Sequence, residues 1–515
     1  MHKLLALYTN EMIKISKKVS VLVMLAIMAV IIFGFGGLVK YQESSYAQNN
    51  SNTDYNAQFQ REEMNRQLES AKSIIAEIQE KKKSAEGDEL QALEAQLEFN
   101  RNQADMLQYA IDKDIILYTS SYRSRAAEKL FSYKTDLAQL EKLPENELPS
   151  DQVQQMSKLR DYVDTLEKVI EKKDFKAFIA LLNDEINNNQ DIPGEEKKIQ
   201  IESNELLLKY NITGENGSES NYNNANAYIN QITNGKLSLL YDVEYNNGTQ
   251  DQKPLSPEMR EKTKNLIAVS EYKLKNLNSG NSDNSANPIS MDSSTIISTM
   301  LSIGIFVVVI LVMILAGGSI SSEVSTGSIK SLIISPVKRW KIFTAKVLSL
   351  LTVGIISALT AYVFSAIAYG IFFGFNTGAP YIYAKNGVAH ELDFYMYHLA
   401  RLGTDFIMVI VFIIFALMLS ILTRNTAASV AISIAVFFVG SQANEILMRF
   451  VKGEWRKFIP FNNLNITAKV FSDTAQNTMP WQVNNSLAFS LIYLAVFIIC
   501  MGYTALDSFN RRDIK

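Results

Sequence analysis

Six long apolar runs constrain the fold of this 515-residue chain more than any other feature of its sequence. Each run reaches or approaches the roughly 20 residues that cross a 30 Å hydrocarbon layer as a helix. The runs cover residues 19–39, 296–317, 347–375, 406–422, 427–443 and 487–503. The sequence therefore predicts an all-α membrane protein with six transmembrane helices, and an even number of spans places both termini on one side of the membrane.

The charged residues divide the chain into two kinds of material. Residues 40–295 contain 30 Lys and Arg against 43 Asp and Glu, whereas the rest of the chain contains 20 against 10. The long apolar runs all lie in the basic part. We therefore expect three regions: residues 1–39 with the first span, an acidic block at 40–295, and residues 296–515 with five further spans.

The basic residues also predict an orientation. If the N-terminus is cytoplasmic, thirteen of the twenty Lys and Arg outside the acidic block face the cytoplasm, as membrane proteins prefer. The acidic block is then extracellular. The first run can alternatively be interpreted as a signal peptide cleaved near "SYA" at 45–47, but its apolar core exceeds the usual length of roughly 7–15 residues. An uncleaved anchor is the favoured interpretation.

Heptad spacing indicates helical pairs in the acidic block. Steps of three and four connect the apolar residues from Met64 to Ile111, with Gly87 at the turn between two antiparallel helices. A second pair follows, from Ala126 to Ile170, interrupted at 143–151. The block is thus predicted to be α-helical and coiled-coil-like. Heptads of this kind ordinarily mean helix packing alone; contact with cargo, cell wall or a partner is the functional alternative.

The second half of the block has a looser pattern. Asp174 and Ser256 are expected to cap helices. The Asn-rich stretches 212–227 and 244–254 are predicted to be exposed loops, and 276–288 is predicted to be a flexible tether into the second span.

Residue types that carry catalysis or bind metal are sparse. Cys500 is the one cysteine, and the three histidines His2, His390 and His398 are scattered. The acidic block therefore has no disulfide, a zinc site is not expected, and no nucleophile with a base is apparent. An extracellular enzyme has almost no support.

The segment "SEVSTGSIKSLIISPVKRWKIFTAK" at 322–346 is unusually polar for a connection between two spans. Residues 323–334 are predicted to form a short helix ended by Pro336, and "KRWK" suits an anchor at the inner membrane surface. A plain interfacial loop is the alternative, but Glu323 and the small residues after it offer a surface for another protein.

These residues resemble those of the ABC-2 type transporter permeases. "EVSTGSIKSLIISPVKRW" at 323–340 is similar to the family's loop after the second span, and "LYTNEMIKISKK" at 7–18 is similar to its amphipathic cytoplasmic helix. The resemblance covers about 260 residues and leaves out the acidic block, which matches a large extracellular insertion in position only. It implies a transmembrane subunit in a bacterial cell membrane that pairs with a second permease, either a copy of itself or a different chain.

The resemblance also implies a separate cytoplasmic ATPase. No phosphate-binding loop is present, because "NGKLS" at 234–238 lacks both the upstream glycine and the following hydroxyl. ATP and magnesium are therefore expected on the partner subunit, with no cofactor in this chain, no nucleic acid partner, and membrane lipids around it. The predicted cytoplasmic coupling segment is 318–346. The predicted ATPase-coupling residues in it are Glu323, Thr326, Gly327, Ser328, Ile329, Lys330, Leu332, Ile333 and Pro336.

Residues 446–461 are basic and amphipathic. Apolar residues recur there at helical spacing, with cations on the other face, which predicts a helix lying in a membrane interface within an external segment 446–484. Its candidate gate or head-group contacts are Arg449, Lys452, Trp455 and Arg456. A purely structural re-entrant helix is the alternative, and Asp405 is expected to be satisfied at the interface.

The function that the sequence favours is outward export of an amphiphilic molecule, such as a peptide antibiotic or a lipid. Transport of a small ion is a second option. The main rival is an envelope scaffold or receptor without an ATPase, resembling the phage infection protein and the type VII secretion accessory proteins.

Overall fold

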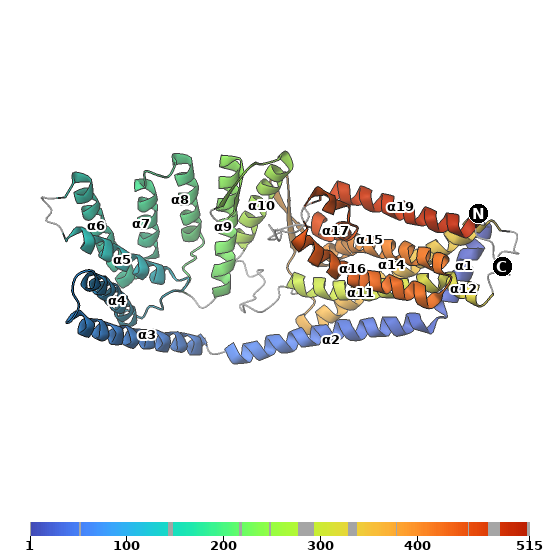
Figure 1. Ribbon diagram of the computed structural model, residues 1–515, viewed down its shortest axis with the longest axis horizontal. Coiled ribbons are helices and arrows are strands. Elements are labelled where there is room, and N and C mark those ends of the chain that lie inside the picture. Colours follow the sequence, from blue (N-terminus) through green and yellow to red (C-terminus); the bar gives the residue numbers. More distant parts are fainter. Residues whose placement is uncertain are drawn as a thin grey trace. The chain divides into compact units, whose positions relative to one another are not determined.

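The structure is a computed structural model that describes residues 2–50, 53–142, 148–215, 219–246, 249–276, 293–327, 337–376, 378–451, 453–471 and 485–511. Within these ranges the regular structure is helical apart from two antiparallel hairpins (Figure 1). The hairpins are β1 (Val243–Asn246) with β2 (Thr249–Pro254), and β3 (Tyr381–Lys385) with β4 (Val388–Leu392).

Six of the helices are long and apolar enough to cross a membrane, by length and composition. They are α2 (Val19–Asn50), α11 (Ser293–Ser319), α14 (Arg339–Phe373), α15 (Phe394–Thr423), α16 (Thr426–Phe450) and α19 (Leu487–Arg511). Each of the six predicted runs coincides with one of these helices. The prediction of an all-α membrane protein with six spans is confirmed.

The chain forms two compact units. We call Met1–Glu43, Met291–Tyr383 and Glu391–Lys515 the membrane unit, and Ser44–Ser290 with Ala384–His390 the helical unit. The membrane unit contains all six apolar helices, whereas the helical unit is built from amphipathic helices.

Helix α11 forms the centre of the membrane unit and packs against α14, α15 and α16. Small residues allow the close approaches. A Cβ added to Gly304 would lie 2.7 Å from the Cβ of Ala361 on α14, and one added to Gly317 would lie 2.8 Å from Val430 on α16. Glycine at such crossings lets helix backbones approach closely in lipid, where burial from water does not drive association.

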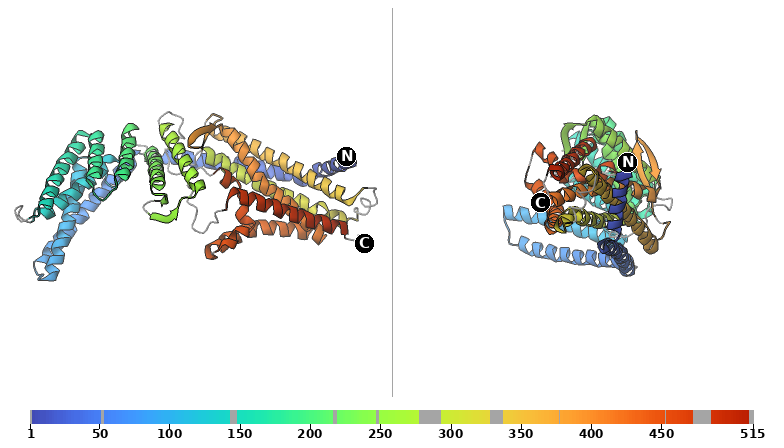
Figure 2. Two further views of the ribbon diagram at one scale, coloured as in Figure 1. Left: turned by 90° about the horizontal axis from the view of Figure 1, so that it is seen from above. Right: turned by 90° about the vertical axis from the view of Figure 1, so that its right-hand side faces the viewer.

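One end of the membrane unit holds a short amphipathic helix, α1 (His2–Ser16), which packs against α14. Figure 2 shows the start of α1 and the end of α19 at this same end, which we call the α1 end. The opposite end carries a 3-10 helix, η2 (Glu454–Phe458), and two short helices, α17 (Phe461–Leu464) and α18 (Thr467–Val470).

The helical unit consists of packed helix pairs. The pairs are α3 (Thr53–Lys82) with α4 (Asp88–Asp112), α5 (Tyr122–Leu140) with α6 (Ser150–Lys172), α7 (Phe175–Asn188) with α8 (Gly194–Lys209), and α9 (Glu219–Tyr241) with α10 (Pro257–Asn276). The predicted α3–α4 turn is confirmed, since Gly87 has a φ of 61° that favours glycine. The predicted caps also form: Asp174 accepts from Ala177 N–H and Ser256 from Met259 N–H.

Both loop predictions in the helical unit need correction. Residues from Glu219 onward, predicted as loop, form the start of α9, and the stretch around 244–254 forms β1 and β2. The Asn and Gly content suggested loops, yet Asn-Gly between two short segments is also a strong hairpin signal. The proposed tether at 276–288, apart from its first residue at the end of α10, and most of the break at 143–151 lie outside the described residues.

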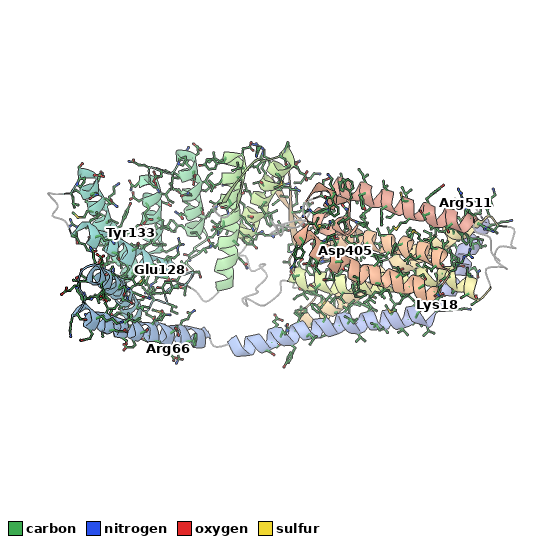
Figure 3. The ribbon with its side chains drawn as sticks, in the orientation of Figure 1. Lys18, Arg66, Glu128, Tyr133, Asp405 and Arg511 are labelled. Atoms are coloured by element: carbon green, nitrogen blue, oxygen red, sulfur yellow. The ribbon has the colours of Figure 1, made fainter. Side chains whose placement is uncertain are left out.

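Polar contacts in the helical unit join its helices to one another. Glu185 of α7 accepts from Lys129 at 2.7 Å and from Tyr133, and Asp184 accepts from Tyr162 at 2.7 Å. Burial, followed by Glu185, raises the pKa of the Tyr133 hydroxyl, which Figure 3 labels on α5. These pairs tie α5 and α6 to α7, a structural role.

Candidate coupling site at the α1 end

A buried lysine lies at the α1 end of the membrane unit. Lys346 of α14 has only 1% of its side chain exposed. Its Nζ donates to Glu11 Oε2 of α1 at 3.1 Å, to Glu323 Oε1 at 2.9 Å, and to the carbonyl oxygen of Ser319 at 3.2 Å. One ammonium group therefore joins α1, α14 and the segment that follows α11.

A second lysine closes the arrangement. Lys14, one helical turn from Glu11 on α1, donates to Glu11 Oε1 and to Glu323 Oε1, each at 3.1 Å. We call Glu11, Lys14, Glu323 and Lys346 the inner ionic cluster. Each carboxylate accepts from both lysines, so the two positive and two negative charges balance within the cluster.

The charges hold one another ionised against the cost of burial. Burial alone would raise the pKa of the Glu11 carboxyl, but Lys346 and Lys14 outweigh it and hold that pKa below its usual value. Burial would likewise lower the pKa of Lys14, yet Glu11 and Glu323 raise it. Removing one partner from such a buried set leaves an uncompensated charge, which is far costlier than replacing the whole set.

A fifth charged group lies beside the cluster without completing it. Burial, followed by the positive charge of Lys346, lowers the pKa of Lys18, which lies at the α1 end in Figure 3. Glu11 and Glu323 oppose that shift but do not overcome it. Lys18 therefore adds positive charge where the cluster is already balanced.

Glu323, the first of the predicted coupling residues, belongs to the short helix α12 (Ser321–Ser325). The start of α12 is fixed by Ser420 of α15, whose Oγ accepts from the backbone N–H of Ile320 at 3.2 Å and of Ser321 at 3.0 Å. Ser321 Oγ donates in turn to the carbonyl of Gly317 at 2.6 Å. Hydrogen bonds fix the beginning of α12, and the inner ionic cluster fixes its middle.

The predicted helix 323–334 is helical in its first residues but does not continue through the described part. Helix α12 ends at Ser325, and Thr326 and Gly327 follow it. Gly327 has a φ of 73°, a left-handed conformation that ends a right-handed helix and suits glycine. The other predicted coupling residues, Ser328, Ile329, Lys330, Leu332, Ile333 and Pro336, lie outside the described residues.

Reasoning from the sequence found Glu323 but missed its partners Glu11, Lys14 and Lys346. A signal was present. Glu11 is the only acidic residue before Glu43, and Glu323 is the only one between Asp292 and Glu391. Lone carboxylates among cations and apolar residues indicate pairing, since a buried acid needs a cation.

The opposite end of the membrane unit contains a larger polar region. Asn463 of α17 is fully buried, and its Oδ1 accepts from Asn485 at 3.0 Å and from Ser490 at 2.8 Å. Lys469 of α18 donates to the Ser490 hydroxyl, and burial lowers the pKa of that lysine. These contacts hold α17 and α18 against α19.

Helix α18 is also fixed to α15. Thr467 donates to Asp405 Oδ1 and shares a 2.6 Å hydrogen bond with the Thr404 hydroxyl. Asp405 was expected to be satisfied at the membrane interface. Only one of its oxygens has a hydrogen-bond partner, because Oδ2 is buried and has only the ion pair with Arg401 at 3.8 Å.

The predicted amphipathic helix 446–461 is not continuous. Helix α16 ends at Phe450, Val451 is extended, and Gly453 has a φ of 123° before η2 begins. Glycine tolerates that conformation and a side-chain residue does not, so the helix breaks there. The helical spacing of the apolar residues continues across this break, and Gly453 is the one residue there that indicates it.

The structure describes three of the four candidate head-group contacts. Arg449 pairs with Glu445 at 2.8 Å, and Trp455 is 51% exposed. Arg456 donates to the carbonyls of Gly453 at 3.1 Å and Val451 at 3.3 Å, so it supports the turn after α16. Lys452 lies outside the described residues.

Among the described residues no group of three or more His, Cys, Asp or Glu side chains is arranged to hold a metal ion. Six membrane-length helices in the described ranges, with α11 at their centre, define a multi-pass membrane protein. The family model of the ABC-2 family transporter proteins matches residues 5–514, and the chain belongs to this family. In this family the matched chain is the transmembrane component, and ATP hydrolysis belongs to a separate subunit.

Two relatives from Bacillus subtilis (strain 168) are similar over part of the chain. The uncharacterized protein YhcI is 28% identical over 207 residues, which are 39% of this chain and 63% of YhcI. The uncharacterized membrane protein YdbK is 27% identical over 208 residues, 40% of this chain and 77% of its own length. The match thus covers less than two thirds of YhcI.

Proposed function

We propose that this chain is the permease subunit of an ATP-driven exporter that moves an amphiphilic molecule, a lipid or a peptide antibiotic, out of the cell. Cytoplasmic ATPase subunits that bind ATP and magnesium drive it, and a second permease subunit completes the pathway. The segment from Glu323 through Pro336 docks the ATPase. The inner ionic cluster transmits the motion of that segment to α1 and α14.

The bridge made by Lys346 is the observation that carries this proposal. A force on Glu323 reaches α14 through a 2.9 Å contact and reaches α1 through the shared lysines. Rigid coupling requires contacts that do not slip, and charge-assisted hydrogen bonds buried from water are the strongest noncovalent links available. The cluster is therefore suited to move α1 and α14 together with the docked segment.

The proposed orientation places the α1 end in the cytoplasm and the helical unit outside. Lys14, Lys18, Arg339 and Lys346 all lie at or near the α1 end, in keeping with the preference of Lys and Arg for the cytoplasmic side. Trp340 lies beside them, 45% exposed, as suits an aromatic residue at head-group depth.

Site-directed crosslinking tests the docking. Cys500 is the one cysteine in the sequence, so a Cys500→Ser background with Thr326→Cys presents a single thiol. We expect the exposed thiol to crosslink, in host membranes, to a protein that mass spectrometry identifies by its phosphate-binding loop. The control is Ser84→Cys on the helical unit, which we expect not to reach that protein.

An ATPase assay tests the coupling. The complex, purified in mild detergent, should hydrolyse ATP. Lys346→Met should change the rate, whereas Lys17→Met, at an exposed residue directly after α1, should not. Recovery of envelope or secretion components without an ATPase would contradict the exporter and favour the scaffold. An ATPase that binds but hydrolyses ATP at the same rate with Lys346→Met as with the unaltered chain would contradict the coupling role of the cluster.

A further inference from the structure

Helix α15 carries a row of unsatisfied polar side chains at the end opposite α1. His398, Arg401 and Asp405 are spaced by three and four residues, which places them on one face of the helix over roughly 10 Å. Among the described residues, six buried side-chain nitrogen and oxygen atoms lack a hydrogen-bond partner, and four belong to these three residues. We call them the α15 polar row.

His398 is the most unusual member. It is fully buried, and neither Nδ1 nor Nε2 has a hydrogen-bond partner. Its ring lies edge-on to Phe394 and Tyr397, at centroid distances of 4.8 and 4.7 Å. Buried polar groups in folded proteins are nearly always hydrogen-bonded, so an imidazole without a partner needs an explanation.

Arg401 and Asp405 face each other without a hydrogen bond. Arg401 Nε and Asp405 Oδ2 lie 3.8 Å apart, and both atoms are buried without a hydrogen-bond partner. The other Asp405 oxygen accepts from Thr467 of α18. The row thus offers one positive donor, one negative acceptor and one imidazole, with the two charges balanced.

The row lies at the depth of lipid head groups. The apolar run of α15 begins at Phe406, and the 18 residues from there to Thr423 extend about 27 Å as helix, close to the hydrocarbon thickness. Residues 398–405 therefore lie just beyond the hydrocarbon. Figure 3 shows Asp405 toward the end of the membrane unit opposite Lys18.

Aromatic rings pack around the His398 end of the row. Tyr397 stacks on Tyr381 of β3 with centroids 3.9 Å apart, and Phe471 lies edge-on to both rings at 5.2 and 5.9 Å. These contacts fix the side chain of Tyr397, the neighbour of His398, against β3 and the residue after α18. Phe471 directly follows α18, so the helix that contacts Asp405 also contributes a ring.

We propose that the α15 polar row binds the head group of a zwitterionic amphiphile that carries a phosphate and a primary ammonium, such as phosphatidylethanolamine. The phosphate accepts from Arg401 and His398, and the ammonium donates to Asp405 Oδ2. The balanced charges favour such a molecule over a purely anionic one. Taking this lipid as the exported cargo rests on the proposed function; the binding site does not.

Helix α18 covers the row in this conformation. The Thr467 hydroxyl is hydrogen-bonded to Asp405 Oδ1 and to the Thr404 hydroxyl. Access for a head group therefore requires α18 to move away from α15. The Thr467→Val variant loses both hydrogen bonds and keeps the row. We therefore expect it to bind the lipid at least as tightly as the unaltered chain.

Lipid binding to the purified chain tests the proposal without an ATPase. Native mass spectrometry in detergent would compare phosphatidylethanolamine, phosphatidylcholine and phosphatidylglycerol. We expect phosphatidylethanolamine to bind about tenfold more tightly than either, because choline has no N–H donor and glycerol no cation. Arg401→Gln, Asp405→Asn and His398→Phe should each weaken that binding about fivefold to tenfold.

The control is Lys40→Gln, which breaks an exposed pair with Glu43 beyond the apolar run of α2 and should leave binding within twofold. A thermal melt of every variant separates lost binding from lost folding. If Asp405→Asn fails to fold, the affinity of Thr467→Val for the lipid still tests the site. Equal affinities for the three lipids would overturn the site. So would an affinity that is unchanged in Arg401→Gln and in His398→Phe. Selective binding by a chain that recovers no ATPase would overturn the proposed function and leave the site standing.

Discussion

The inner ionic cluster and the α15 polar row contain similar residues in opposite states of satisfaction. In the cluster every charged group contacts two others, at 2.9 to 3.1 Å. In the row the cation and the acid are 3.8 Å apart, and a histidine beside them has no hydrogen-bond partner. A closed set of charges that satisfy one another joins helices, whereas the unsatisfied groups of the row can take a ligand once α18 moves away. The same residue types thus serve two roles according to whether their partners belong to the chain.

Breaking the closed set should have the largest effect. Lys346→Met leaves Glu11 and Glu323 buried with only the half-exposed Lys14, and we expect a loss of about 3–5 kcal/mol in the free energy of unfolding. Thermal unfolding in detergent measures it. Adding Glu11→Gln and Glu323→Gln to Lys346→Met should restore much of the stability, since no buried charge is then left alone. A triple variant less stable than Lys346→Met would contradict this account.

The closed set should also respond to acid. The pKa of Glu11 is lower in the folded state than its ordinary value near 4.5, so its ionisation stabilises the fold above that value. The contribution is lost as the pH falls through the lowered pKa. We expect the stability difference between the unaltered chain and Glu11→Gln to be full at pH 7 and to shrink below about pH 4.5. A stability difference that stayed constant between pH 7 and pH 3 would show that the ionisation of Glu11 does not stabilise the fold.

The turn that supports the opposite end should show an intermediate effect. Gly453 has a φ of 123°, so Gly453→Ala forces a strained conformation costing about 1–3 kcal/mol. Thermal unfolding measures this loss. The matched control is Gly502→Ala in α19, where an added Cβ has no neighbour within 4 Å and a small gain is expected. Equal melting temperatures for the two variants would show that the turn is not held in this conformation.

An exposed pair should show the smallest effect and so calibrate the comparison. Lys40 and Glu43 are 2.9 Å apart on α2, with 45% and 41% of their side chains exposed. Solvent screens such a pair, and Lys40→Gln should change the free energy of unfolding by at most about 0.5 kcal/mol. A loss comparable to that of Lys346→Met would mean that burial does not distinguish the two sets.

The sequence predicted the fold better than the sites because fold signals are local. Apolar runs and heptads repeat within a few turns, and they located all six spans and the α3–α4 pair. Continuity at 446–461 was wrong because one residue, Gly453, outweighs an otherwise regular spacing. The hairpin at 243–254 was missed because its strands are short and polar.

Site geometry depends on residues far apart in the sequence. Glu323 was a predicted coupling residue, but Lys346 was counted only as one of the basic residues that set the orientation. Nothing between Glu11 and Lys346 reveals that they meet, since 335 residues separate them. The α15 polar row was missed for another reason: Asp405 alone was considered, and its relation to His398 appears once α15 is known to begin at Phe394.

The distance in sequence between Glu11 and Lys346 gives the inner ionic cluster a place in biosynthesis. At roughly 5–20 residues per second, a ribosome needs about 17 to 67 s to go from one to the other. The helical unit is synthesised and folds during that interval. Until Lys346 is made, Glu11 has Lys14 as its neighbour on α1. Arrival of Lys346 then joins the first segment made to the third apolar helix. The cluster is therefore completed only after the third apolar helix has been made, and α1 takes its final contacts with α14 late in the synthesis of the chain.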